Sequence, residues 1–282
     1  MERCTNCGAN VPRETPDCPR CGTFMGFPNV RDAEAEQAAL HARYEDAVDD
    51  AKTRGAQHPV QAFEGTVDQK ARAAIALPPP FLRQFLESGR TLYAPYESQV
   101  DAGVRWAAPV TDDRARRAVD SKLFGTYASR IVFAVLSLDG LAPRSYGSCT
   151  IELSHWTTER RASLLECNSF HFVEQHGLRL TDPVPAGYRA TWGDAGRLAV
   201  AKLADRVYPS TQNSRFPRLL VYDADDRDQD DFIEVHIHGA IDLQSVNVVA
   251  TPRPTNESRD PDHDMARSRE WARAQEITVK DR

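Results

Sequence analysis

Hydrophobic positions follow a helical period over much of the first half of the chain. Residues 31–54 are rich in Ala, Glu and Gln and predict one helix, which Gly55 ends as a C-cap residue. Its apolar stripe is narrow and consists of Leu40, Tyr44, Val48 and Ala51. So thin a stripe favours a spacer helix, and pairing with a second chain is the alternative.

Further helices are expected between this spacer and the middle of the chain. The pattern predicts a helical stretch over Val67–Leu77, a stop at Pro78–Pro80 and a short amphipathic piece over Phe81–Leu86. Asp112 and Asp113 then open a helix through Leu123, with acidic residues at its start as the helix dipole favours. We expect its arginines to form a solvated face, with a nucleic-acid contact as the alternative: Arg114, Arg116 and Arg117.

The period changes to that of strands near residue 131. The predicted strands are Ile131–Leu138, Ser148–Leu153, Ser169–Val173, Pro217–Tyr222 and Phe232–Ile237, and Ile241–Val249 is a last apolar segment. A helix is expected over Gly196–Asp205, and Asp223–Asp231 reads as a solvated acidic turn. From Thr251 the chain is polar, with one weak helix around Met265–Ala274.

Helices that precede a strand-rich half predict an α+β fold with a mixed or antiparallel sheet and flanking helices. The expected organisation is a zinc ribbon (1–25), a helical linker (26–58), a body (59–250) and a polar tail (251–282). Within the body, residues 59–125 are predicted to be helical and residues 126–250 rich in strands.

Four of the six cysteines form two CxxC pairs, Cys4 with Cys7 and Cys18 with Cys21. This spacing is typical of a tetrahedral Zn²⁺ site, and four thiolates fill it, so the metal would be structural. Gly8 and Gly22 follow the two pairs, where a chain curled around a metal needs φ > 0. Two disulfides are the alternative; they need an oxidising compartment, and the first residues show no signal-peptide pattern.

Composition narrows the class of protein only modestly. The chain has 282 residues, 41% of them hydrophobic and 27% charged, with a net charge of −6. These values are typical of a globular protein and argue against a chain devoted to coating nucleic acid. The apolar runs are too short to span a membrane, and the cysteine usage fits a cytoplasmic protein.

The strand over Phe232–Ile237 has an unusual polar face. Because alternate residues of a strand share a face, Glu234, His236 and His238 point one way. One carboxylate and two imidazoles can bind a metal or form a wall of a catalytic cleft. The alternative is an edge strand whose polar face meets water.

A second polar cluster could hold a phosphate-bearing ligand through Arg and hydrogen-bonding side chains. It covers residues 146–148, 160–163 and 166–169, and its candidate contacts are Tyr146, Ser148, Arg161, Ser163 and Asn168. The alternative is that Ser and Asn mark ordinary turns and that Arg160 and Arg161 are solvated. The sequence has no GxGxxG, Walker A, GxSxG or HExxH motif, which disfavours Rossmann dehydrogenases, P-loop ATPases and α/β-hydrolases.

Residues 125–250 resemble the ADP-ribosyltransferase superfamily in the order of their motifs. Tyr146-Gly147 enters a strand, Arg161-Ala162-Ser163 and Asn168-Ser169 follow, and Phe232–Val235 runs into His238–Leu243. The resemblance implies NAD as the substrate and Glu234, with His236 beside it, as the catalytic residues. It also implies that Tyr146, Ser148, Arg161, Ser163 and Asn168 contact the dinucleotide. The ExE or QxE pair of that superfamily is absent, because positions 232 and 236 are Phe and His.

Three functions remain open. The first is an NAD-dependent ADP-ribosyltransferase whose ribbon docks a protein or nucleic-acid target. The second is a metal-dependent hydrolase that uses Glu234, His236 and His238. The third is a non-catalytic adaptor that binds a partner through its ribbon.

Overall fold

The computed structural model describes residues 1–87, 93, 110–253 and 262–282. Its helices are α1 Pro28–Glu34, α2 Gln37–Thr53, α3 Gln57–Lys70, α4 Pro79–Glu87, α6 Val110–Phe124, α7 His155–Thr158, α8 Ser169–Gln175, α9 Ala195–Leu203, α10 Phe216–Leu220 and α11 Asp262–Ala274. Short 3-10 turns are η1 Gly125–Arg130, η2 Arg144–Tyr146, η3 Trp192–Asp194, η4 Ala204–Arg206, η5 Asn213–Arg215 and η6 Leu243–Ser245.

Eight strands form the central sheet, in the order β12-β11-β5-β3-β4-β10-β6-β7. They are β3 Arg72–Leu77, β4 Ile131–Ser137, β5 Cys149–Leu153, β6 Ala162–Leu165, β7 Arg189–Thr191, β10 Glu234–His238, β11 Val246–Thr251 and β12 Thr278–Asp281. Within this sheet the β11–β12 pair is parallel and the other neighbours are antiparallel. Two-stranded ladders join β1 Glu2–Arg3 to β2 Asn10–Val11, and β8 Val221–Tyr222 to β9 Asp231–Phe232. The α+β prediction is confirmed.

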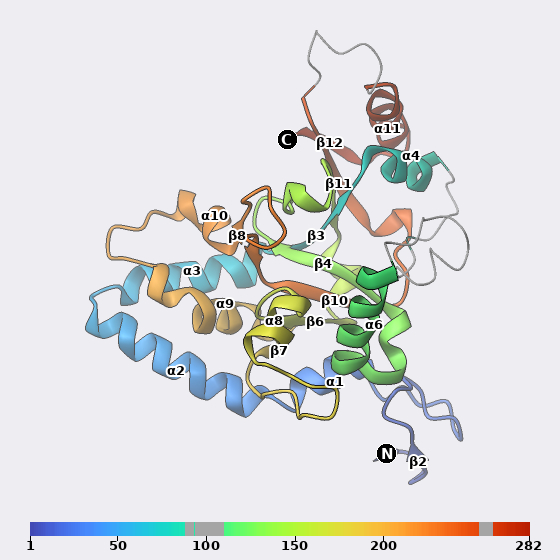
Figure 1. Cartoon of the computed structure of the whole chain (residues 1–282), viewed down its shortest axis with the longest axis vertical. Coiled ribbons are helices and arrows are strands. Elements are labelled where there is room, and N and C mark those ends of the chain that lie inside the picture. Colours follow the sequence, from blue (N-terminus) through green and yellow to red (C-terminus); the bar gives the residue numbers. More distant parts are fainter. Residues whose placement is uncertain (88–92, 94–109, 254–261) are drawn as a thin grey trace.

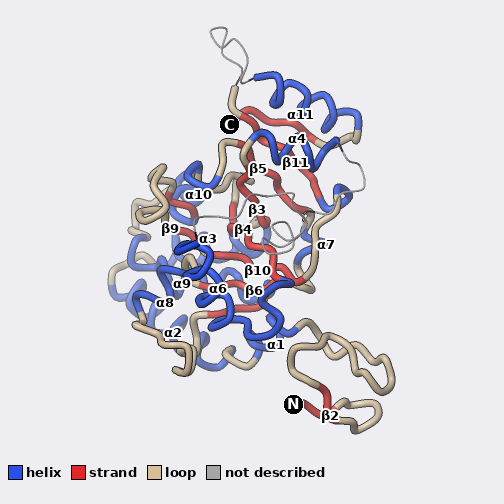
Figure 2. Tube along the Cα trace, turned by 45° about the vertical axis from the view of Figure 1, so that its right-hand side comes forward, coloured by secondary structure: helices blue, strands red, loops and turns tan. Residues whose placement is uncertain are grey.

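Helices cover the sheet in separate groups. Helices α2, α3 and α9 pack together in the largest hydrophobic core, and α6, η1 and α8 form a second one (Figure 1). Helices α4 and α11 pack on each other at one end of the molecule, and the N-terminal cysteine motif lies at the other end (Figures 1 and 2).

The helix predicted over residues 31–54 is in fact two helices, α1 and α2, and it is not a spacer. Leu40 and Ala51 are buried in the largest core, so the narrow stripe packs on the body. Gly55 ends α2 with φ of 71°, as its C-cap role required.

Several predicted elements are wrong in type. Residues 72–77 form the central strand β3 instead of extending a helix, because sheet neighbours on both sides override the helix propensity of its alanines. Ser169–Val173 is helical because the side chain of Asn168 caps α8 by accepting from the backbone N–H of Phe170, at 2.9 Å. Pro217–Leu220 lies in helix α10, which has a proline in its first turn.

Residues 262–282, which belong to the predicted polar tail, pack on the body of the protein. Helix α11 buries Ala272 in the largest core, and β12 extends the sheet beside β11. Strands β6 and β7 were not predicted, because β6 is buried along its whole length and β7 has three residues.

Candidate metal centre and buried carboxylate site

Two equivalent turns present the four cysteines of the N-terminal motif. In the first, Cys4 N–H donates to Ala9 O and Gly8 N–H to Cys4 O; in the second, Cys18 and Gly22 repeat the pattern. Gly8 has φ of 69° and Gly22 φ of 71°, as predicted from their positions after each pair. The motif has a very small core of Cys4, Val11 and Cys18.

The sulfur atoms are placed to hold a metal ion such as zinc. Cys4 Sγ lies 3.6 Å from Cys21 Sγ, and Cys7 Sγ lies 3.6 Å from Cys18 Sγ. Four thiolates around zinc, with Zn–S bonds near 2.3 Å, would lie about 3.8 Å apart, so the set fits. A hydrogen bond with the Thr23 hydroxyl lowers the pKa of Cys21 to about 6. In Cys7 a backbone hydrogen bond with Ala9 lowers the pKa, but burial and the neighbouring thiols outweigh it and raise the pKa to about 12.

The ligand atoms of these four cysteines all lie within 4.8 Å of one another. In the described part of the chain, no other group of three or more His, Cys, Asp or Glu residues could hold a metal in this way. Glu234, His236 and His238 do not form such a group. The free thiols Cys149 and Cys167 are buried and lie outside it.

Strand β10 lies in the middle of the sheet, between β4 and β6. Glu234 is opposite Val135 on one side and Leu165 on the other, and all five residues of β10 are buried. The alternative of a water-exposed edge strand is therefore wrong. The polar face of β10 is instead covered by aromatic rings and by helix α1.

Hydrogen-bonding groups of Ser169, His236 and Asn168 surround the Glu234 carboxylate, which is 6% exposed. Its Oε2 accepts from the Ser169 N–H at 3.0 Å and from the Ser169 hydroxyl, and it lies 2.9 Å from His236 Nε2. Its Oε1 has a long contact, 3.5 Å, with Asn168 Nδ2. Among the described residues its ion-pair partner is His236, and no Lys or Arg neutralises it.

The two histidines of β10 occupy different surroundings. His236 packs edge-on against Phe124 and Phe133, and its buried Nδ1 has no hydrogen-bond partner among the described residues. His238 lies near Phe27 and Tyr127. Burial, together with the charges of Arg130 and Arg161, lowers the pKa of His238 to about 4.

The structure brings two of the five predicted dinucleotide contacts to Glu234. Asn168 Nδ2 reaches both Glu234 and the hydroxyl of Tyr146, at 3.2 Å from the latter. Burial and the charge of Glu234 raise the pKa of Tyr146 to about 12, so its hydroxyl stays protonated.

The other three contacts lie elsewhere in the structure. Ser163 is opposite His236 in the sheet and accepts from Asn29 Nδ2 at 3.2 Å. Arg161 donates to the carbonyls of His238 and Ala240, so it ties strand ends together. Ser148 directly precedes β5, and in the described ranges no hydrogen bond joins its side chain to Glu234.

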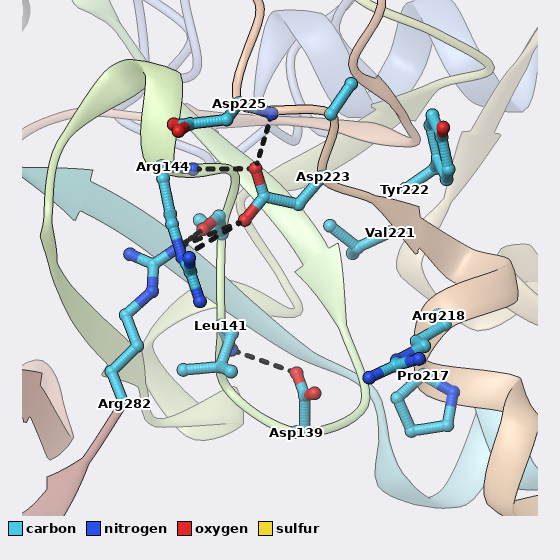
Figure 3. A pocket seen from close by; sticks show the side chains of 12 residues that line it. Asp139, Leu141, Arg144, Pro217, Arg218, Val221, Tyr222, Asp223, Asp225 and Arg282 are labelled. Atoms are coloured by element: carbon cyan, nitrogen blue, oxygen red, sulfur yellow. Dashed lines mark hydrogen bonds and ion pairs between the residues drawn. The ribbon is translucent and has the colours of Figure 1, made fainter. Parts of the chain in front are cut away.

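The described surface has two hollows, and neither is lined by Glu234. The larger, about 510 Å³, is shown in Figure 3: Arg144 and Arg282 converge on Asp223, while Arg218 and Tyr222 lie on the opposite wall. The smaller, about 300 Å³, is lined by Cys167, Lys202 and the end of the acidic loop. The acidic loop is anchored rather than free, because Asp230 is buried and bonded to Ser145 and Asp231 pairs with Lys202 and Arg206.

Sequence reasoning named Ser169 without assigning it a role, and it missed Asn29. Ser169 supplies two of the hydrogen bonds to Glu234, and its place just after the cap residue Asn168 was the available signal. Asn29 of helix α1 is 2% exposed, and its side chain donates hydrogen bonds to β6 and β10. Its partner His236 is 207 residues away in the sequence, so no local pattern could indicate this contact.

Comparison with known proteins supplies no family for the chain: no family model matches it, and no curated protein matches it. No helix in the described ranges combines the length and the apolar composition that a membrane span requires.

Proposed function

We propose that this chain is an ADP-ribosyltransferase-like enzyme that cleaves the nicotinamide–ribose bond of NAD at Glu234. Its four N-terminal cysteines would hold one structural Zn²⁺, and the motif they fold would dock a protein or nucleic-acid target. The proposal joins the order of motifs in the sequence to the geometry around Glu234.

The observation that supports it is the unequal use of the two carboxylate oxygens. Oε2 is saturated by Ser169 and His236, whereas Oε1 has one long contact. No Lys or Arg among the described residues pairs with the carboxylate, and Ser169 and His236 hold it in place. Such a group can stabilise a positive charge that develops next to it.

The chemistry follows from this arrangement. As the bond between C1′ and the nicotinamide nitrogen breaks, its electron pair leaves with nicotinamide and the ribose becomes an oxocarbenium ion. Glu234 Oε1 would accept from the ribose 2′-hydroxyl and stabilise this cation, while His236 and Ser169 hold the carboxylate. Asn168 and the neutral Tyr146 would position the substrate beside it, and the acceptor would attack C1′.

The test is release of nicotinamide from NAD by the full-length protein and by Glu234→Gln. We expect the substitution to lower the rate by about 100-fold or more, since the amide cannot supply the charge. Glu36→Gln is the matched control, because Glu36 is another buried carboxylate, near Arg189 and away from β10. NAD turnover that is absent in the wild-type protein, or equal in Glu234→Gln, would refute the proposal.

A non-catalytic adaptor is the second candidate, and the burial of Glu234 favours it. The Ser169 hydrogen bonds tie the start of α8 to β10, which is a structural role. In that case Glu234→Gln lowers the melting temperature and the wild-type protein releases no nicotinamide. The hydrolase hypothesis stays a prediction; in the described structure His238 forms no hydrogen bond with Glu234 or His236.

A further inference from the structure

The cysteine motif makes hydrogen bonds and an ion pair with helix α1. The guanidinium of Arg31, at the middle of α1, donates to Glu2 Oε2 at 2.9 Å and to the carbonyl of Thr15 at 3.1 Å. Its side chain is 10% exposed, so it is enclosed by the motif. Arg13, between the two cysteine pairs, forms an ion pair with Asp32 at 2.5 Å.

The other face of α1 contacts the strand that bears Glu234. Asn29 Nδ2 donates to the carbonyl of His236 at 2.9 Å, to that of Arg161 at 3.0 Å and to Ser163 Oγ at 3.2 Å. Asn29 therefore connects β10 with β6 and with the residue before it. Asp32 accepts from the Tyr127 hydroxyl at 2.6 Å, and Tyr127 lies near His238.

An aromatic chain follows the same route. Phe24 of the motif packs edge-on against Phe27, with ring centres 5.1 Å apart, and Phe27 lies 5.2 Å from the ring of His238. The hydrogen bonds, the ion pair and the rings therefore all lead from the motif to the end of β10.

We infer that metal binding by the four cysteines positions β10 through helix α1, so that loss of the metal weakens the pairing of β6 with β10. The inference rests on the metal site of the proposed function but not on NAD chemistry. The motif has almost no core, so the metal supplies its folding energy. Without the metal, the nearly buried Arg31 and Asp32 lose their partners in the cysteine motif. We expect this loss to displace helix α1 and to weaken the hydrogen bonds of Asn29.

The test is hydrogen exchange of the full chain, read by mass spectrometry, with zinc bound and after removal by a chelator. We expect exchange at the His238 and Gly239 amides, which bond to Arg161 and Arg130, to rise by about tenfold. Amides of the β11–β12 pair, at the far end of the sheet, serve as the internal reference and should not change.

Two variants separate coupling from a general loss of stability. Arg31→Gln removes the hydrogen bonds of Arg31 to Glu2 and Thr15 and should weaken the response of β10 to chelation while the protein still binds one zinc. Arg3→Gln changes an exposed arginine of the same motif and should leave the response intact. Unchanged exchange at β10 in the zinc-free protein, or an unaltered response in Arg31→Gln, would overturn the inference.

Zinc analysis separates this failure from failure of the metal proposal. A protein that contains no zinc after purification in its presence refutes the metal site and the coupling together. A protein that contains zinc but shows no change at β10 refutes the coupling alone.

Discussion

His238 is a buried imidazole whose surroundings favour its neutral form. It faces Phe27 of the motif–α1 connection, Tyr127 of η1, and the charges of Arg130 and Arg161, and its pKa falls from 6.5 to about 4. Because the unfolded chain then binds more protons than the folded one, stability decreases as pH falls from about 6.5 to about 4.

We expect His238→Gln to remove this part of the pH dependence. The free energy of unfolding, measured in urea at pH 7 and pH 5, should fall less in the variant than in the wild-type protein. Burial raises the pKa of Glu36, Glu64 and Asp68, which gives the opposite trend, but both proteins share it. An equal pH dependence in the two would show that His238 titrates normally.

Gly187 allows a close approach between the loop before β7 and helix α2. It has φ of 90°, and a Cβ atom there would meet the backbone carbon of Ala39 at 2.9 Å. Gly187→Ala should therefore lower the free energy of unfolding by about 1–3 kcal/mol, measured by urea denaturation. Gly65→Ala, in open space within α3, is the control and should raise it by about 0.5–1 kcal/mol.

At the scale of single residues, the sequence was informative where the chemistry is local. Gly8 and Gly22 were predicted from their places beside the cysteine pairs, because the turn that presents two thiolates is a property of a few neighbouring residues. Asn29 could not be found in this way, since its partners are His236, Arg161 and Ser163.

At the scale of elements, α11 shows how a polar segment can still be part of the core. It presents Ala272, which is fully buried, and the weak helix expected at 265–274 is confirmed in a longer form. Helix α11 packs against α4, and Ala272 belongs to the largest hydrophobic core.

Ala272→Asp should lower the free energy of unfolding by roughly 3 kcal/mol or more, because it places a carboxylate in the core. Ala274→Asp, on an exposed position of the same helix, should change it by less than about 0.5 kcal/mol. Thermal unfolding followed by circular dichroism measures both. A similar melting temperature for the two variants would mean that α11 detaches from the body at little cost.

Elements were mistaken where tertiary contacts outweigh local preference. An Ala-rich segment became the central strand β3, and a segment rich in β-formers became helix α8 once Asn168 capped it. Strand β4 was predicted well, because a continuous apolar run bounded by Asp139-Gly140 is a strong signal for a buried strand.

At the scale of the whole molecule, the cysteine motif, helix α1 and the sheet form a continuous set of contacts. Helix α1 lies between the motif and strands β6 and β7, which places the proposed metal and the proposed catalytic carboxylate on connected elements (Figure 2). The exchange experiment with Arg31→Gln tests this connection directly.

The sequence by itself determined the four-cysteine site, its two glycine turns, the α+β class and the common face of Glu234, His236 and His238. These features depend on spacing and alternation over a few residues. The tertiary structure alone decided that β10 is central, that Ser169 and Asn29 belong to its network, and that the motif contacts the body through Arg31 and Asp32. Those facts depend on contacts between residues far apart in the chain, for which a local pattern holds no signal.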